Sequence, residues 1–326
     1  MLLDIVFILL GLALLVKGGD YLVDGSVAIA KRAKLSEMVI GLTVVGFGTS
    51  MPELLVSAQS AWMGNSGIAI GNVVGSNISN IALILGVTSI VQVIPAQKIT
   101  LKIDLPFMLL SFALFVAIAM TGSIGRVAGV IAVIILFSFV AYQVRKSRKA
   151  EAALAKENPD AQNEAEPMAL WKAILLVIVS FLAMVFGANI LVEGASNIAR
   201  LLGVTDRIIG LTIVAVGTSL PELFSSVMAA IKGKTDMAIG NIIGSGTFNI
   251  LCVIGVSSII TPIMGTNIGF AFDYALMVIL GVLLWLFLRS KYILERWEGI
   301  LLTTIYVAYL AKTIIMAYLE KTIIIG

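Results

Sequence analysis

Two glutamates, Glu53 and Glu222, stand inside long apolar stretches, and each directly follows a proline. A charged side chain at the middle of a bilayer costs at least about 2.5–3.5 kcal/mol, so an acid in that position usually faces the protein interior and has a function. Each proline lacks an N–H donor and disfavours helix in the residue before it, which predicts a break in each helix and unpaired backbone carbonyls. An acid beside such a break is suited to binding a cation.

Hydroxyl and amide oxygens accompany both glutamates. They belong to Thr49, Ser50, Thr218 and Ser219, which precede the prolines, and to Ser76, Asn80, Ser245 and Asn249 on the next apolar segments. Oxygen ligands select hard ions such as calcium, sodium or magnesium, while the absence of histidine argues against zinc or copper. Two carboxylates can neutralise one calcium or two sodium ions, and two adjacent negative charges also favour H+ as a third ligand.

The two glutamate motifs belong to one long internal repeat. GLTVVGFGTSMPEL from Gly41 matches GLTIVAVGTSLPEL from Gly210, and GNVVGSNISN from Gly71 matches GNIIGSGTFN from Gly240, always with a shift of 169 residues. A proline kink with back-bonded hydroxyls would explain a single motif equally well. Two copies in one register, each with an acid, favour a binding site.

Composition places the chain in a bilayer, because 60% of its residues are hydrophobic, 13% are charged and the mean hydropathy is +1.07. The apolar runs are long enough to cross as helices. We therefore predict an all-α membrane protein with ten transmembrane helices. The expected spans are 2–28, 38–62, 68–92, 105–121, 125–144, 170–198, 208–231, 237–260, 272–288 and 298–318. They form a first repeat at 1–144 and a second at 170–326, joined by a polar linker at 145–169.

An odd number of spans per repeat inserts the second copy upside down, which makes the fold two inverted five-helix repeats. The loops on the linker side carry sixteen Lys and Arg residues against five on the other side. Positive residues favour the cytoplasm, so the linker is expected inside and both termini outside. Inversion also lets Glu53 and Glu222 meet near the midplane.

The remaining residues exclude several functions and predict structural roles for others. Without histidine the chain lacks a Ser-His pair and an HExxH site, so no enzyme activity and no cofactor are expected. Cys252 is alone and cannot form an intramolecular disulfide. The basic residues belong to loops beside the lipid bilayer and do not imply nucleic acid. Glycines at four-residue spacing, as in Gly240 and Gly244, predict close helix packing, while Asp104 at a span start predicts helix capping.

The paired motifs GTSMPELLVS with GNVVGSNISN and GTSLPELFSS with GNIIGSGTFN resemble the alpha-repeats of the sodium/calcium exchanger family, within the calcium:cation antiporters. The resemblance covers nearly the whole chain and implies a prokaryotic type with a short linker, located in the cell inner membrane. It implies that Glu53 and Glu222 bind calcium and sodium, helped by the hydroxyls and amides above and by the backbone carbonyls of Gly46 and Ala215. Helices one and six would slide across the core.

This chain has Asn249 where some members, including potassium-dependent exchangers, carry Asp. The loss of one charge weakens a potassium-dependent interpretation. An antiporter that exchanges calcium for sodium is the leading hypothesis, and a calcium or other cation/proton antiporter is the alternative. A passive cation channel fits an inverted repeat poorly.

The charge count predicts that a reporter on the N-terminus lies outside the cell. A periplasmic enzyme fused there should be active, and a fluorescent protein that folds only in the cytoplasm should stay dark. The same pair of reporters inserted in the linker should give the reverse result. Cytoplasmic fluorescence from the N-terminal fusion would contradict the predicted topology.

Overall fold

A computed structural model describes residues 1–157 and 168–325, apart from the side chains of 154–157, 206, 207, 211, 214, 215 and 317–325. The elements before the linker are α1 (Leu2–Ala33), α2 (Glu37–Ile40), η1 (Gly41–Val45), α3 (Gly46–Thr49), α4 (Met51–Trp62), α5 (Ser66–Ser79), η2 (Asn80–Leu85), α6 (Gly86–Val91), β1 (Ile94–Pro95), η3 (Thr100–Asp104), α7 (Leu105–Ala119), β2 (Ser123–Ile124) and α8 (Arg126–Glu157), where η denotes a π-helical segment.

After the linker the same kinds of element return. They are α9 (Leu170–Leu201), α10 (Asp206–Ile209), η5 (Gly210–Val214), α11 (Ala215–Gly217), α12 (Leu220–Ile231), α13 (Thr235–Phe248), η6 (Asn249–Ile254), α14 (Gly255–Ile260), β3 (Ile263–Met264), α15 (Ala271–Lys291), β4 (Ile293–Leu294) and α16 (Arg296–Ile325). The series α4, α5, η2 and α6 recurs as α12, α13, η6 and α14 with the shift of 169 residues seen in the sequence.

Among the described residues, eight helical segments are long and apolar enough to cross a membrane. A ninth candidate is the bent pair Glu37–Thr49 and Met51–Trp62. Where the seventh span was predicted, at 208–231, α12 is apolar but has only 12 residues. The chain is thus an all-helical membrane protein with eight or nine candidate spans, and its four described strands have two residues each.

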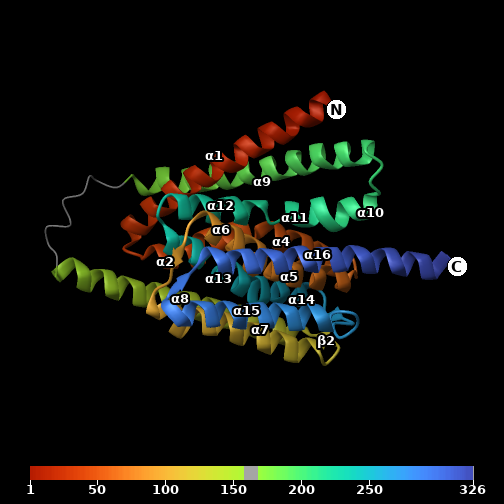
Figure 1. The fold of residues 1–326 in the computed structure, drawn as a ribbon. Helices are drawn as coiled ribbons and strands as arrows, with labels where there is room; N and C mark the ends of the chain where they lie inside the picture. The colour runs from red at the N-terminus through yellow and green to blue at the C-terminus, as the bar shows by residue number, and fades with distance from the viewer. Residues whose placement is uncertain (158–167, 326) are drawn as a thin grey trace.

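The helices form a bundle in which the two chain ends lie at one end and the junction of α8 and α9 with the linker lies at the other (Figure 1). The apolar windows of Ser66–Val91 and Thr235–Ile260 are 72% and 89% buried, more than those of the other spans. These two segments, which contain the second polar motif of each copy, therefore occupy the centre.

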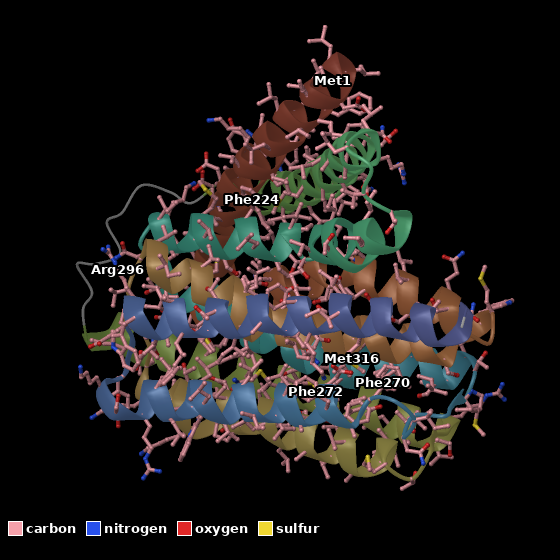
Figure 2. The ribbon with its side chains drawn as sticks, turned by 45° about the vertical axis from the view of Figure 1, so that its right-hand side comes forward. Met1, Phe224, Phe270, Phe272, Arg296 and Met316 are labelled. Atoms are coloured by element: carbon pink, nitrogen blue, oxygen red, sulfur yellow. The ribbon has the colours of Figure 1, made fainter. Side chains whose placement is uncertain are left out.

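Helices α1 and α9 pack side by side along one face of the bundle (Figures 1 and 2). A Cβ on Gly11 would lie 2.6 Å from the carbonyl oxygen of Gly187, so only glycine permits this approach. The α1 helix also contacts α12, whose Phe224 is labelled in Figure 2. At the linker end, Lys232 after α12 joins Asp20 and Asp24 of α1 at 2.6 Å each.

A close crossing in the core joins α13 to α2 and η1. A Cβ on Gly244 would lie 2.3 Å from the carbonyl oxygen of Leu42, and a Cβ on Gly240 would lie 2.5 Å from that of Met38. The predicted packing role is confirmed for these two glycines. Their matches in the first copy, Gly71 and Gly75, are partly exposed.

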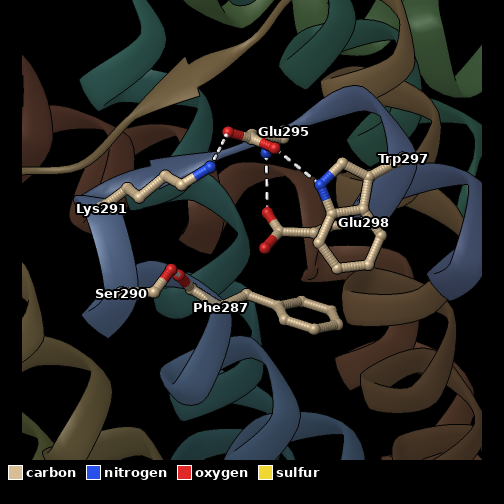
Figure 3. A network of polar contacts seen from close by, with 6 residues as sticks. All are labelled: Phe287, Ser290, Lys291, Glu295, Trp297 and Glu298. Carbon is tan, nitrogen blue, oxygen red and sulfur yellow. Dashed lines mark hydrogen bonds and ion pairs between the residues drawn. The ribbon is translucent and has the colours of Figure 1, made fainter.

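Short strands join the two halves. β1 pairs with β4 and β2 pairs with β3, both antiparallel. Beside β4, the carboxylate of Glu298 accepts a hydrogen bond from the backbone N–H of Glu295 and so caps the start of α16 (Figure 3). Glu295 itself accepts hydrogen bonds from Lys291 and Trp297, and these bonds hold its pKa below the usual value (Figure 3).

The capping role predicted for Asp104 is wrong. Its carboxylate makes no cap bond at the start of α7 because π-helical turns of η3 precede it. It is buried and instead accepts a hydrogen bond from Gln143 of α8. Asp104 therefore joins two neighbouring helices.

Substitution of Gly244 by alanine tests the crossing of α13 with η1. The added methyl group would meet the Leu42 backbone, which cannot rotate away, so Gly244→Ala should destabilise the protein by about 1–3 kcal/mol. Thermal unfolding in detergent measures the change. Gly67→Ala is the control, because Gly67 of α5 has no described neighbour within 4 Å. Equal melting temperatures for the two variants would contradict the proposed packing.

Candidate functional site

Both glutamate helices break at the predicted place. α3 ends at Thr49 and α4 starts at Met51, with a bend of 46° between the two parts of the span. Ser50 at the break has φ −85° and ψ 4°, and Ser219 in the second copy has nearly the same values, φ −90° and ψ 2°. Proline in the first turn of α4 and of α12 provides the local cause, because it is compatible with a helix start and not with a helix interior.

The two carboxylates are buried and without partners. Glu53 is 1% exposed and Glu222 is 0% exposed. All four carboxylate oxygens are buried without a hydrogen-bond partner, and the two groups are near enough to interact electrostatically. Ionised carboxylates in a low-dielectric interior are strongly unfavourable unless a cation or hydrogen-bond donors compensate them. The positive charge of a bound cation could therefore compensate this pair.

Two asparagines lie where the helices that follow the glutamate helices change from α-helical to π-helical geometry. Asn80 is the first residue of η2, and Asn249 is the first residue of η6. Both are 0% exposed. Neither amide atom of Asn80 has a partner, and the Oδ1 atom of Asn249 has none either. Single π-helical turns are rare in proteins, and those that occur are often at functional sites. No pattern of residues predicted them here.

The elements that carry these side chains are in mutual contact. α4 packs against η6, α12 packs against η2, and η6 also packs against α5. Glutamate helices of each copy thus meet the asparagine segment of the other copy. Packing between the copies therefore brings into contact the elements that carry Glu53, Glu222, Asn80 and Asn249.

The predicted hydroxyl ligands other than Thr218 are buried, but their hydrogen bonding differs. Ser50 has an unpartnered Oγ. Thr49 donates to the carbonyl of Val45 at 3.1 Å, and Ser245 lies 3.4 Å from the carbonyl oxygen of Gly46. Ser76 accepts a hydrogen bond from Asn249 at 3.1 Å.

The remaining predicted ligands lie at the second break. Ser219 is buried and Thr218 is partly buried. Ala215, whose carbonyl the family resemblance implicated, begins α11 and lies outside the residues described in atomic detail. Its role stays a prediction.

Asn72 and Asn241 were missed by the sequence analysis. They are matched by the repeat, and each donates to the glutamate helix of its own copy. Asn72 Nδ2 bonds the carbonyl of Glu53 at 3.2 Å and Ser57 Oγ at 2.8 Å. Asn241 Nδ2 bonds Ser226 Oγ at 2.8 Å, and Thr49 donates to its Oδ1 at 3.3 Å. Both asparagines directly follow a glycine at the start of the second repeated motif, Gly71 and Gly240. This matched position is the feature of the sequence that could have indicated their role.

Unpartnered oxygens define the chemistry of this cluster. They number seven and come from Ser50, Glu53, Asn80, Glu222 and Asn249. In the described part of the chain, no three or more His, Cys, Asp or Glu residues are grouped so that they could hold a metal ion. A site with two carboxylates and otherwise neutral oxygens suits a hard cation, since calcium takes six to eight oxygen ligands.

Comparisons with known proteins identify the family. The profile of the sodium/calcium exchanger protein family matches residues 3–145 and 172–315. The sodium/calcium exchanger MaX1 of Methanosarcina acetivorans is 34% identical over 94% of this chain and 97% of its own length. The inner membrane protein YrbG of Escherichia coli is 32% identical over 95% and 97%.

A solved structure gives the same result. The sodium-calcium exchanger NCX_Mj, soaked with 2.5 mM Na+ and 0.1 mM Ca2+, superimposes with a TM-score of 0.81 and 34% identity over 95% of this chain and 98% of that chain. The chain belongs to the sodium/calcium exchanger family.

Proposed function

We propose that this protein is a secondary antiporter that exchanges calcium for sodium by alternating access, with both ions bound at Glu53 and Glu222. The observation that carries the proposal is the buried pair of carboxylates whose four oxygens form no hydrogen bond within normal geometry. Membership in a family of cation exchangers supports it. MaX1 and NCX_Mj are both named as exchangers of sodium and calcium.

The charge of the site explains why two different ions would compete. Two carboxylates balance one calcium or two sodium ions, and the neutral oxygens of Ser50, Asn80 and Asn249 complete the coordination. Ions that share ligands cannot bind together. Such mutual exclusion couples the exit of one ion to the entry of the other.

We further propose ten spans arranged as two inverted repeats, with the termini outside and the linker in the cytoplasm. The recurrence of the central elements after 169 residues supports the duplication. Both termini lie at one end of the bundle, and the ends of α8 and α9 that meet the linker lie at the other (Figure 1). Each half then crosses the membrane an odd number of times, which supports an even number of spans in total. The relative named as an inner membrane protein supports that location.

Alternating access requires that the two copies be covered unequally. Gly240 and Gly244 of α13 are buried against η1, while Gly71 and Gly75 of α5 are partly exposed. This difference in cover supports a conformation in which the two sides of the bundle are not equally open. Movement of α1 with α9 across the core would close the more open side.

Loss of either site carboxylate should stop exchange. Glu53→Gln or Glu222→Gln leaves a single carboxylate in the site, which binds calcium more weakly than two carboxylates do. Calcium uptake into sodium-loaded vesicles should therefore fall at least about a hundredfold. Glu37→Gln is the matched control, because Glu37 forms a partly exposed ion pair with Lys234 at 2.6 Å. That pair contributes little, so uptake should stay within about threefold of the unsubstituted protein. Normal uptake by either site variant would contradict the proposal.

The coupling ion is tested in the same vesicles. An outward sodium gradient should drive calcium uptake that survives a protonophore. Uptake that follows a pH gradient and not a sodium gradient would favour a calcium/proton antiporter, the alternative left by the sequence. Calcium conductance at fixed voltage without any counter-ion would indicate a passive channel.

A further inference from the structure

One of the buried differences between the two copies of the site changes its hydrogen bonding. Asn77 of α5 corresponds through the repeat to Gly246 of α13. Asn77 is 0% exposed, and its Oδ1 atom accepts a hydrogen bond from Asn249 Nδ2 at 3.1 Å. Together with Ser76 Oγ at 3.1 Å, it occupies both donors of the Asn249 amide. The oxygen of Asn249 is left as the atom without a partner.

A methionine fixes the orientation of Asn77 in turn. Asn77 Nδ2 lies 3.6 Å from the sulfur of Met277, which is 0% exposed. A thioether sulfur only accepts hydrogen bonds, so it favours the NH2 end of the amide and disfavours the oxygen end. The oxygen of Asn77 must then face Asn249. This chain of two hydrogen bonds sets which end of the Asn249 amide remains available.

The other copy lacks this arrangement. Gly246 has no side chain, and Met108 is the residue that corresponds to Met277. The sulfur of Met108 lies 2.9 Å from the position that a Cβ on Gly246 would occupy. Asn80, the match of Asn249, has no hydrogen-bond partner for either amide atom. One asparagine of the pair is held in a single orientation, and its counterpart is not.

The orientation matters because a hard cation binds the amide oxygen and is repelled by the NH2 group. We propose that Asn77 is a positioning residue that sets the affinity of the site for calcium by holding the Asn249 oxygen available to the ion. The inference rests on the proposed exchange function. A carboxylate at position 249 would present an oxygen to the ion in either orientation. The hydrogen bond from Asn249 to Asn77 explains how a neutral amide can present its oxygen there as well.

A double-mutant cycle tests the proposal. Asn77→Leu keeps the branching and the number of heavy atoms of the side chain but removes the acceptor, so the KM for calcium uptake should rise about tenfold, with a smaller change in the maximal rate. In an Asn249→Asp background the same substitution should change KM less than about twofold, because both carboxylate atoms are oxygens. An Asn80→Asp background is the control and should retain the tenfold effect. Equal effects in the Asn249→Asp and unsubstituted backgrounds would overturn the proposal and indicate packing alone.

A second pair of variants removes the dependence on the folding of Asn77→Leu. Met277→Leu conserves volume but removes the sulfur acceptor and should raise the KM for calcium about threefold. Met108→Leu changes the matching methionine, which has no amide to orient, and should leave KM unchanged. Equal KM values for the two variants would overturn the inference. If the unsubstituted protein shows no sodium-driven calcium uptake, the proposed function itself fails, and the two failures are thereby distinguished.

Discussion

The structure depends on the burial of two carboxylates, Glu53 and Glu222, in an apolar bundle that gives their oxygens no protein partner. An interior of this kind penalises charge by several kcal/mol, and hydrogen bonds from the protein would reduce the penalty. Satisfying them internally would, however, remove the affinity for an external ion. In the proposed function, this unfavourable burial is the source of the affinity for a cation.

Other features of the bundle follow from holding these acids in place without neutralising them. The prolines place each glutamate in the first turn of a new helix, where it can project from a break. Asn72 and Asn241 bind the backbone and nearby hydroxyls of the glutamate helices and leave the carboxylate oxygens free. The acids are thus positioned through their backbones and not through their charged groups.

Differences between the copies carry as much information as their likeness. Gly244 packs tightly against η1 while Gly75 is partly exposed, and Asn77 anchors an amide where Gly246 cannot. A perfectly symmetric pair of repeats would be equally closed on both sides. Unequal packing makes the cover of the two copies different, in keeping with the alternating access proposed above.

The sequence by itself determined the membrane environment, the duplication, the helix breaks and the identity of the two acids. These properties depend on local composition and on proline chemistry, which a linear pattern records. Only the tertiary structure decided that Asp104 bonds Gln143 and does not cap a helix, that π-helical turns begin at Asn80 and Asn249, and which amide atoms remain unpartnered. Hydrogen bonds between residues far apart in the chain depend on how helices cross, and no local pattern of residues encodes that geometry.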